Sequence, residues 1–558
     1  MLKTQTSPPA TDRRIGHSGL VRPAGLGLGE WPGWLLCIAL VAPWLGATAW
    51  LRPLAIPDEG RYVGVAWEML RSGDWLVPTL DGLPFFHKPP LFYWITAASM
   101  KLLGPGAMAA RGAAWLASIA ATTALFMFVR RWVGLVEAWA AVVALVTTPL
   151  FYGAAQYANT DMLVAGCISV TVLSAADALL ARTRGLRFAG ALATAFAAAG
   201  LGVLAKGLIG AVLPVLLLAA WGLATRRFGK VVSLLMWPMG WILFTAIVAP
   251  WFIAMQHRFP EFAHYFFVVQ HFQRFSVAGF NNAQPWWFYP AVLVALTFPW
   301  SLRLTAMVDR RHWERNDRRD VRILMLMWVG VVTTFFSLPS SKLVGYILPA
   351  LPPLAFLIAD VCRPLLDGRA PGDAARARPL LTSNLLLRAT CVLATTGCVA
   401  LAVAAHFYQP KSHRLLAEEL QASRGEGDPV LFMGNYYYDV GFYARIDEPI
   451  LVVDEWQKEE VEKDSWRREL VDAARFAPSG SSRRLLVLEE AEPILCRAPS
   501  SWLVGRWPPS AMPPWLAVEP PYYQSGDTAL WHIAPNSSSV RSHLRCNDAP
   551  ARRADSGP

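Results

Sequence analysis

Ionisable side chains in this sequence gather beside long apolar stretches, where a buried charge is unfavourable. They fall at the ends of these stretches or in the loops between them, and they are Asp58, Glu59, Arg61, His87, Lys88, Asp161, Lys206, His271, Arg274 and Lys342. A charged side chain at the centre of a bilayer costs roughly 2.5–3.5 kcal/mol on insertion scales. Charges that share one side of a membrane therefore indicate a polar cavity on that side.

The carboxylates allow two interpretations. Asp58 begins an amphipathic segment and Asp161 precedes an apolar stretch, so each could simply cap a helix and favour its dipole. Two carboxylates above one cavity could instead bind a metal ion or an amine, or assist attack on a substrate. The residues alone leave both interpretations open.

Two lysines lie at breaks between helices. Lys88 is followed by Pro89 and Pro90, and Lys206 is followed by Gly207, so backbone amides near both are free. A point charge beside free amide donors suits a phosphate group. The alternative is a lysine that only extends its ammonium group to the membrane surface.

Composition excludes an ordinary soluble enzyme. The chain has 558 residues, of which 54% are hydrophobic and 16% charged, against about 25% charged in a globular domain. No Walker motif, nucleophile elbow, Rossmann fingerprint or Cys/His zinc-finger pattern occurs in the sequence. Its net charge of +11 comes from short clusters between apolar runs. These clusters indicate membrane topology and not nucleic-acid binding.

A helix needs about 20 apolar residues to cross a bilayer, and eleven stretches of roughly that length occur. Their limits are 31–51, 109–129, 136–156, 162–181, 188–205, 207–225, 231–254, 286–308, 323–338, 343–361 and 386–407. Lys and Arg concentrate in alternate loops, such as 182–187 and 226–230, which predicts that these loops and the N-terminus are cytoplasmic. Residues 409–558 then lie outside.

This topology predicts the domain organisation. A basic cytoplasmic tail, 1–30, precedes a transmembrane domain, 31–408, whose outside loop 52–108 contains two interfacial helices at 59–71 and 89–103. The segments DPVLFMG, PILVVDEW and RRLLVLEE predict strands of a small α/β domain over 409–535. The polar end, 536–558, is expected to be disordered. Cys496 and Cys546 are the cysteines that could pair.

Several motifs carry a family resemblance. The segment 57–104 is PDEGRYVGVAWEMLRSGDWLVPTLDGLPFFHKPPLFYWITAASMKLLG, and it is followed by NTD (159–161), KG (206–207), HFQRF (271–275) and SSKLVGYILPALPPLA (340–355). In order and spacing they resemble the bacterial GT-C glycosyltransferases that use a polyprenyl-phosphate sugar. The resemblance is to the lipid A 4-amino-4-deoxy-L-arabinose transferases, which are related to the protein O-mannosyltransferases.

The resemblance implies a multi-spanning α-helical membrane protein with 11 to 13 transmembrane helices, two juxtamembrane helices and a periplasmic α/β C-terminal domain. It implies a location in the bacterial inner membrane, among membrane lipids. It also implies an undecaprenyl-phosphate-linked sugar donor and an acceptor that is lipid A or another envelope component.

The resemblance assigns roles to several residues, whereas Glu59, Arg61 and Lys342 are expected in the site from their charge and position alone. Asp58 and Asp161 are the expected catalytic carboxylates. A divalent metal ion such as zinc is expected at His87, Asp161 and His271, although relatives usually have Glu where this chain has His87. They also usually have Glu where this chain has Gln270. The expected substrate-binding residues, which include holders of the donor phosphate, are Glu59, Arg61, Lys88, Lys206, Arg274, Lys342 and Tyr346.

Two other functions fit the sequence less well. A protein O-mannosyltransferase-like enzyme would share the donor type but need a hydroxyl acceptor, for which Asp58 is the first candidate base. A secondary transporter would place ionisable groups and broken helices near the midplane. Here the charges gather at one face instead.

Overall fold

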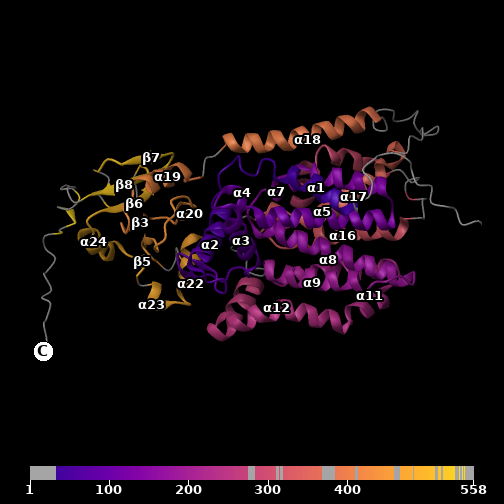
Figure 1. Cartoon of the computed structure of the whole chain (residues 1–558), viewed down its shortest axis with the longest axis horizontal. Helices are drawn as coiled ribbons and strands as arrows, with labels where there is room; N and C mark the ends of the chain where they lie inside the picture. Colours follow the sequence, from indigo (N-terminus) through magenta and orange to yellow (C-terminus); the bar gives the residue numbers. More distant parts are fainter. Residues whose placement is uncertain are drawn as a thin grey trace, which may run out of the picture.

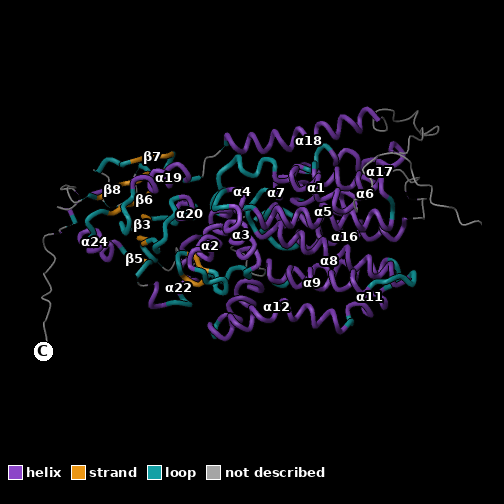
Figure 2. The backbone as a smooth tube through the Cα atoms, in the orientation of Figure 1, coloured by secondary structure: helices purple, strands orange, loops and turns teal. Residues whose placement is uncertain are grey.

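The computed structural model of the chain describes residues 33–273, 283–308, 313, 318–366, 384–408, 412–457, 461, 465–481, 483–508, 513, 515–516, 519–534, 540, 543–544 and 546. The predicted basic tail, 1–30, lies outside these residues, as does most of the predicted C-terminal tail. The described residues form a long bundle of helices with a smaller part at one end that contains a β-sheet (Figures 1 and 2).

The chain is a membrane protein. Among the described residues, seven helices are long and apolar enough to span a bilayer. They are α5 (Gly112–Trp132), α8 (Thr160–Thr183), α9 (Ala189–Lys206), α12 (Pro238–Arg258), α16 (Arg319–Ser337), the segment Val344–Arg363 formed by η4 (Val344–Ala350) and most of α17 (Leu351–Leu366), and α18 (Asn384–Phe407).

Two further spans are bent. Helices α6 (Leu135–Val146) and α7 (Pro149–Ala155) meet at 71°, and α14 (Phe288–Leu296) and η2 (Trp300–Val308) meet at 114°. Pro149 is the first residue of α7 and Pro299 directly precedes η2, and the residue before a proline disfavours helical geometry. The other two expected stretches coincide with shorter apolar helices, α1 (Gly33–Gly46) and α10 (Ile209–Ala224). Every expected stretch therefore falls on a helix or a bent pair.

Small residues let the spanning helices touch. A Cβ atom on Gly210 of α10 would lie 2.2 Å from the carbonyl carbon of Gly202 in α9. One on Gly166 of α8 would lie 2.7 Å from the oxygen of Ala117 in α5. Membrane helices gain stability from such close backbone contact because lipid provides no hydrophobic drive between helices. Helices α8 and α9, which carry Asp161 and Lys206, are thereby fixed against their neighbours.

The loop after α1 forms the expected pair of helices, α2 (Asp58–Ser72) and α3 (Leu91–Leu103), with a small hairpin between them and α4 (Ala107–Ala110) after them. The hairpin pairs β1 (Thr79–Leu80) with β2 (Leu83–Pro84). Glu68 of α2 holds it by accepting hydrogen bonds from the Thr79 hydroxyl and from the backbone amides of Asp81 and Gly82.

The smaller part is an α/β domain, as expected. Its sheet has the order β5-β4-β3-β6-β8-β7, in which β3 to β6 are parallel and β8 is antiparallel to both its neighbours. The three expected strands are β3 (Val430–Met433), β4 (Leu451–Val453) and β5 (Leu485–Leu486); sequence analysis missed β6 (Ser501–Arg506), β7 (Tyr523–Ser525) and β8 (Thr528–Ile533). The domain's helices are α19 (Arg414–Ser423), α20 (Val440–Tyr443), α22 (Trp466–Ala474), α23 (Pro478–Ser481) and α24 (Leu488–Arg497). A disulfide joins Cys496 to Cys546, as expected.

The α/β domain sits directly on the loop after α1 (Figure 1). The Tyr443 hydroxyl accepts a hydrogen bond from the Leu54 amide at 2.7 Å, and Asp81 Oδ1 accepts one from the Ile450 amide at 2.9 Å. A Cβ atom on Gly60 of α2 would lie 3.0 Å from that of Tyr438. One face of α2 is therefore covered by the domain.

Candidate functional site

A charged pair connects the ends of two spanning helices near α2. Asp161 is in the first turn of α8, and Lys206 is the last residue of α9. The Lys206 ammonium donates to Asp161 Oδ1, and its nitrogen lies 4.5 Å from the centre of the Tyr346 ring in η4. The pair is mostly buried, with 16% of the Lys206 side chain and 9% of the Asp161 side chain exposed. Three expected site residues are thus brought together.

Asp161 is not the N-cap of α8, although it lies in the first turn, where its charge favours the helix dipole. Asn159 is the N-cap of α8, and its side-chain oxygen accepts a hydrogen bond from the Asp161 amide at 2.9 Å. The Asn159 side-chain amide also donates to Asp161 Oδ2 at 3.1 Å. Because Asn159 satisfies the helix end, the Asp161 carboxylate is left to hold Lys206.

A glycine makes room for this carboxylate. A Cβ atom on Gly345 would lie 2.2 Å from Asp161 Oδ2, well inside van der Waals contact. The segment that carries Tyr346 can therefore approach the pair only because position 345 has no side chain.

A second charged cluster joins α2 to the α/β domain. Arg61 pairs with Asp58 at 2.5 Å, and its other terminal nitrogen donates to Glu469 of α22. The Tyr438 hydroxyl donates to Glu469 Oε2 at 2.5 Å. Asp58 is the most open member, with 38% of its side chain exposed. Pro57 is the N-cap of α2, with no side-chain capping bond, so Asp58 is not the N-cap either.

The structure corrects the role expected for Glu59. The residue is completely buried, and its carboxylate accepts hydrogen bonds from Arg111 Nε at 2.9 Å, from the Ala55 and Ala158 amides at 2.8 Å, and from Arg52. Burial alone would raise the pKa of Glu59, but Arg111 and Arg52 hold it at about 2. Glu59 therefore fixes the loop next to Asn159 and does not contact substrate.

Two tyrosines that sequence analysis missed lie close to both charged groups. Burial raises the pKa of the Tyr62 hydroxyl, and the charges of Arg61, Asp58, Lys206 and Asp161 all act on it. Burial also raises the pKa of Tyr157, on which Asp58 and Asp161 act. Both charged groups therefore act on the same two tyrosines. Tyr62 directly follows Arg61 in the sequence, but only the fold brings it near Lys206.

The remaining expected residues are placed as follows. His87 and Lys88 are half-buried just before α3, and the His87 ring stacks on Phe85 at 4.5 Å. Lys342 is buried, and its ammonium donates to the Gln284 carbonyl at 2.7 Å. It fastens the segment before η4, so its expected contact with substrate does not fit. Arg274 lies outside the described residues, as does the side chain of His271.

The described residues do not test the expected metal site. Among them, no group of three or more His, Cys, Asp or Glu side chains could hold a metal ion. The Asp161 carboxylate is neutralised by Lys206 instead. The third expected ligand, His271, is not among the described side chains, so the metal stays a prediction, and we assign it no step.

The fold and the site define a class of protein: a polytopic membrane protein with a charged site where the helix bundle meets an extramembrane α/β domain. Residues 54–266 match the family model of dolichyl-phosphate-mannose-protein mannosyltransferases. Over this segment the chain is therefore similar to that family of glycosyltransferases, and it is similar to the aminoarabinose transferases as well.

Individual relatives agree with this assignment. The undecaprenyl phosphate-alpha-4-amino-4-deoxy-L-arabinose arabinosyl transferase of Erwinia tasmaniensis is 33% identical over 310 residues, and the match spans 55% of each chain. The protein of that name in Aeromonas salmonicida is 32% identical over 370 residues, 66% of each chain. The alignments thus span between about half and two thirds of the relatives' length.

Solved structures show the same fold. ArnT from Cupriavidus metallidurans bound to undecaprenyl phosphate superposes with a TM-score of 0.72 at 23% identity, covering 90% of this chain and 98% of that one. The archaeal oligosaccharyltransferase AglB from Archaeoglobus fulgidus, in complex with an inhibitory peptide and a dolichol-phosphate, gives a TM-score of 0.50 at 11% identity. That match covers 85% of this chain and 69% of AglB. The fold thus extends well beyond the segment matched by the family model.

Proposed function

We propose that this chain transfers 4-amino-4-deoxy-L-arabinose from undecaprenyl phosphate to a phosphate group of lipid A. The observation that carries the proposal is the Lys206–Asp161 pair under Tyr346, a cation held at the end of a spanning helix. The printed names of the relatives support the donor and the sugar. The bias of Lys and Arg among the loops supports an inner-membrane location with the α/β domain in the periplasm.

The proposed chemistry follows from charge. The bond between the sugar's anomeric carbon and the carrier phosphate breaks, and the electron pair leaves with the undecaprenyl phosphate. An acceptor oxygen forms the new bond to the same carbon. A positioned cation lowers the barrier by stabilising the negative charge as it develops on the leaving phosphate. Lys206 is suited to this task because Asp161 and Tyr346 orient its ammonium before the donor arrives.

Arg61 and Asp58 would act on the acceptor. A lipid A phosphate is already anionic, so it can attack without a strong base. Arg61, which Glu469 and Asp58 hold in place, is positioned to attract it. Asp58 is the more open carboxylate of the site, and with a hydroxyl acceptor it would be the base.

That second case is the alternative function, a protein O-mannosyltransferase-like transfer to a hydroxyl group. The family model that matches residues 54–266 favours it. Both functions use the same donor type and the same Lys206–Asp161 pair. They differ in the acceptor, which only an assay can identify.

The experiment uses the purified full-length chain in lipid vesicles with undecaprenyl-phosphate aminoarabinose. Lipid A and a hydroxyl-bearing peptide are offered as acceptors in separate reactions. We expect transfer to lipid A, and a loss of at least 100-fold (about 3 kcal/mol) in Lys206→Met. Lys101→Met, which removes an exposed lysine of α3, should retain full activity. Transfer to the peptide alone would establish the alternative, and equal activity of Lys206→Met would refute the role of the pair.

A further inference from the structure

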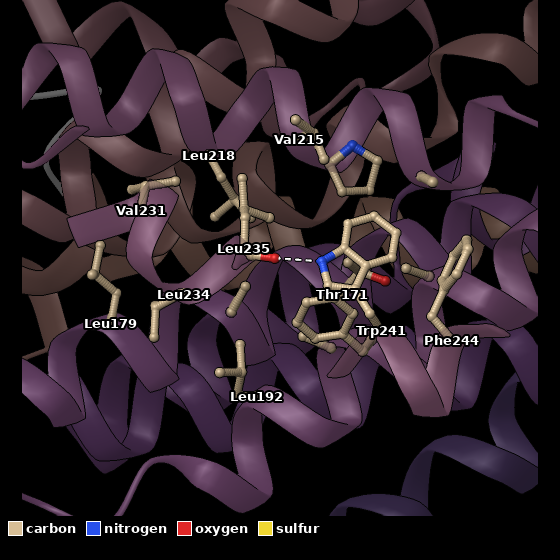
Figure 3. A pocket seen from close by; sticks show the side chains of 16 residues that line it. Thr171, Leu179, Leu192, Val215, Leu218, Val231, Leu234, Leu235, Trp241 and Phe244 are labelled. Carbon is tan, nitrogen blue, oxygen red and sulfur yellow. Dashed lines mark hydrogen bonds between the residues drawn. The ribbon is translucent and has the colours of Figure 1, made fainter. Parts of the chain in front are cut away.

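A cavity unrelated to the charged site lies between helices α8, α9, α10, α11 (Phe228–Leu235) and α12 (Figure 3). The space between these helices, including the part open to the outside, is about 680 Å³. Among the described residues that line it, only Thr171 and Trp241 have a polar side-chain atom, and both atoms already have partners. The Thr171 hydroxyl donates to the Cys167 carbonyl at 2.8 Å, and the Trp241 indole donates to the Leu235 carbonyl at 2.7 Å. The cavity therefore offers no hydrogen bond to a sugar.

The cavity opens on the outer surface of the bundle, which in a bilayer would face hydrocarbon. Val215 and Trp241, which line the cavity, are 42% and 47% exposed. Their apolar neighbour Ile242 is 61% exposed. An apolar groove that faces lipid is filled by acyl chains, because an empty one would lose the dispersion contacts of its walls. Along α8 the lining runs from Thr171 to Leu179, about 12 Å. This is close to the depth of one leaflet's hydrocarbon, about 15 Å.

One end of the cavity is basic. Leu179 of its lining precedes the loop 182–187, and Val231 follows the loop 226–230 directly. These two loops contain Arg and Lys but no Asp or Glu. Arg182 and Lys230 are exposed, and Arg182 donates to Ser233 of α11 at 2.8 Å. Figure 1 places α11 at the end of the bundle opposite to the α/β domain.

From these observations we infer a binding site for an anionic glycerophospholipid. One acyl chain occupies the cavity, and the phosphate-bearing head group lies on Arg182 and Lys230. A neutral head group would gain nothing from these charges, whereas each lysine or arginine near the surface attracts an anionic lipid. The site lies at the other end of the bundle from Lys206 and does not depend on the proposed function.

The test measures lipid binding to the detergent-purified full chain by native mass spectrometry. The probes are phosphatidylglycerol and phosphatidylcholine with identical acyl chains. We expect phosphatidylglycerol to bind about tenfold more tightly, and the double variant Arg182→Gln/Lys230→Gln to lose this preference. Arg388→Gln removes an exposed charge on α18, away from the cavity, and should keep it.

A second variant tests whether the cavity binds an acyl chain. Ala199→Phe places a ring in the cavity and should weaken the binding of both lipids at least fivefold. Its melting temperature without added lipid checks that the variant is folded. Equal binding of the two lipids by the unaltered protein would overturn the inference. An unchanged preference in the double variant, or unchanged binding in a folded Ala199→Phe protein, would do the same.

Discussion

At the scale of single residues, Glu59 and Lys206 show how the same kind of ion pair can serve two purposes. Glu59 is fully enclosed and surrounded by protein donors, so its charge stabilises the loop. Lys206 keeps part of its side chain open and has a carboxylate and an aromatic ring as neighbours. The difference in exposure separates a fully enclosed charge from one that stays partly accessible.

Replacing Glu59 should therefore destabilise the fold. Glu59→Gln leaves Arg111, which is completely buried, without its counter-charge. We expect the free energy of unfolding to fall by about 3–5 kcal/mol, seen as a lower melting temperature of the detergent-purified chain. Glu261→Gln, which changes an exposed carboxylate, is the control. A variant as stable as the original protein would contradict the structural role.

The Glu59 carboxylate also predicts a loss of stability in acid. Its pKa is lowered to about 2 in the folded chain, so its contribution to stability is present above the usual carboxylate pKa of about 4.3 and is lost as the pH falls through 2. Glu59→Gln should therefore remove part of the acid sensitivity. Melting temperatures of both proteins between pH 5 and pH 2 measure this, and parallel curves would argue against it.

Position 345 tests the geometry of the Lys206–Asp161 pair. Gly345→Ala should push the Asp161 carboxylate away from Lys206, because the new Cβ atom would overlap Asp161 Oδ2. We expect at least a tenfold loss of transfer, with a small change in melting temperature. Gly330→Ala, whose added Cβ atom meets nothing within 4 Å, should be neutral. Full activity of Gly345→Ala would mean that the pair is not needed in this arrangement.

Sequence analysis identified most of these residues but not their contacts. Asp58, Asp161 and Lys206 were chosen by residue type and position, and Tyr346 came from the family resemblance; the structure brings the last three together. The structural roles of Glu59 and Lys342 could not be predicted from the sequence. Their partners, such as the Ala158 amide and the Gln284 carbonyl, are distant in sequence or belong to the backbone.

At the scale of elements, the hairpin between α2 and α3 joins the bundle to the α/β domain. Asp81 at its tip is buried, and its Oδ1 atom accepts a hydrogen bond from the Ile450 amide. Burial and the nearby Glu68 raise the pKa of Asp81 to about 7, although Arg484 and the Ile450 amide oppose this. Burial raises the pKa of Glu68 as well. The junction therefore contains carboxyl groups that hold their protons more tightly than free ones.

The junction should weaken in alkali. For Asp81 the folded state has the higher pKa, so its contribution is greatest below the unfolded value of 3.8 and is lost as the pH rises through about 7. Between pH 5.5 and pH 8.5 this amounts to about 2 kcal/mol. Asp81→Asn should remove that part of the difference in melting temperature between the two pH values. An identical difference in the variant would show that Asp81 does not titrate in this range.

The lengths of the apolar segments predicted the spanning helices well, because a helix must be long and apolar to cross a bilayer. They missed the bends at Pro149 and Pro299, whose angles depend on neighbouring helices. Strands β6 and β8 were missed because a short apolar run fits a buried strand or a buried helix equally well. Strand β6 lies beside β3 in the sheet although 67 or more residues separate them in sequence.

At the scale of the whole molecule, charges lie at both ends of the bundle. The end below the α/β domain carries Lys206, Asp161, Arg61 and Asp58, whereas at the other end Asp360 of α17 is buried against Arg322 of α16. A secondary transporter places such groups near the midplane. These charges lie at the ends of the bundle and not at its midplane, which disfavours a transporter.

The covering domain should be needed for the site. Glu469→Gln removes the carboxylate through which α22 holds Arg61. We expect the melting temperature to fall, by an amount equivalent to about 2–4 kcal/mol, and transfer to fall with it. Glu426→Gln, which alters an exposed carboxylate of the same domain, should change neither. Unaltered activity of Glu469→Gln would mean that the contact only joins the domains.

The most direct test of the central claim is mass spectrometry of lipid A from bacteria with and without the gene. The cells are complemented with the original protein, Lys206→Met or Lys101→Met. The account predicts an addition of the mass of one aminopentose that the original protein and Lys101→Met restore and Lys206→Met does not. A lipid A profile that is the same in every strain would contradict transfer to lipid A.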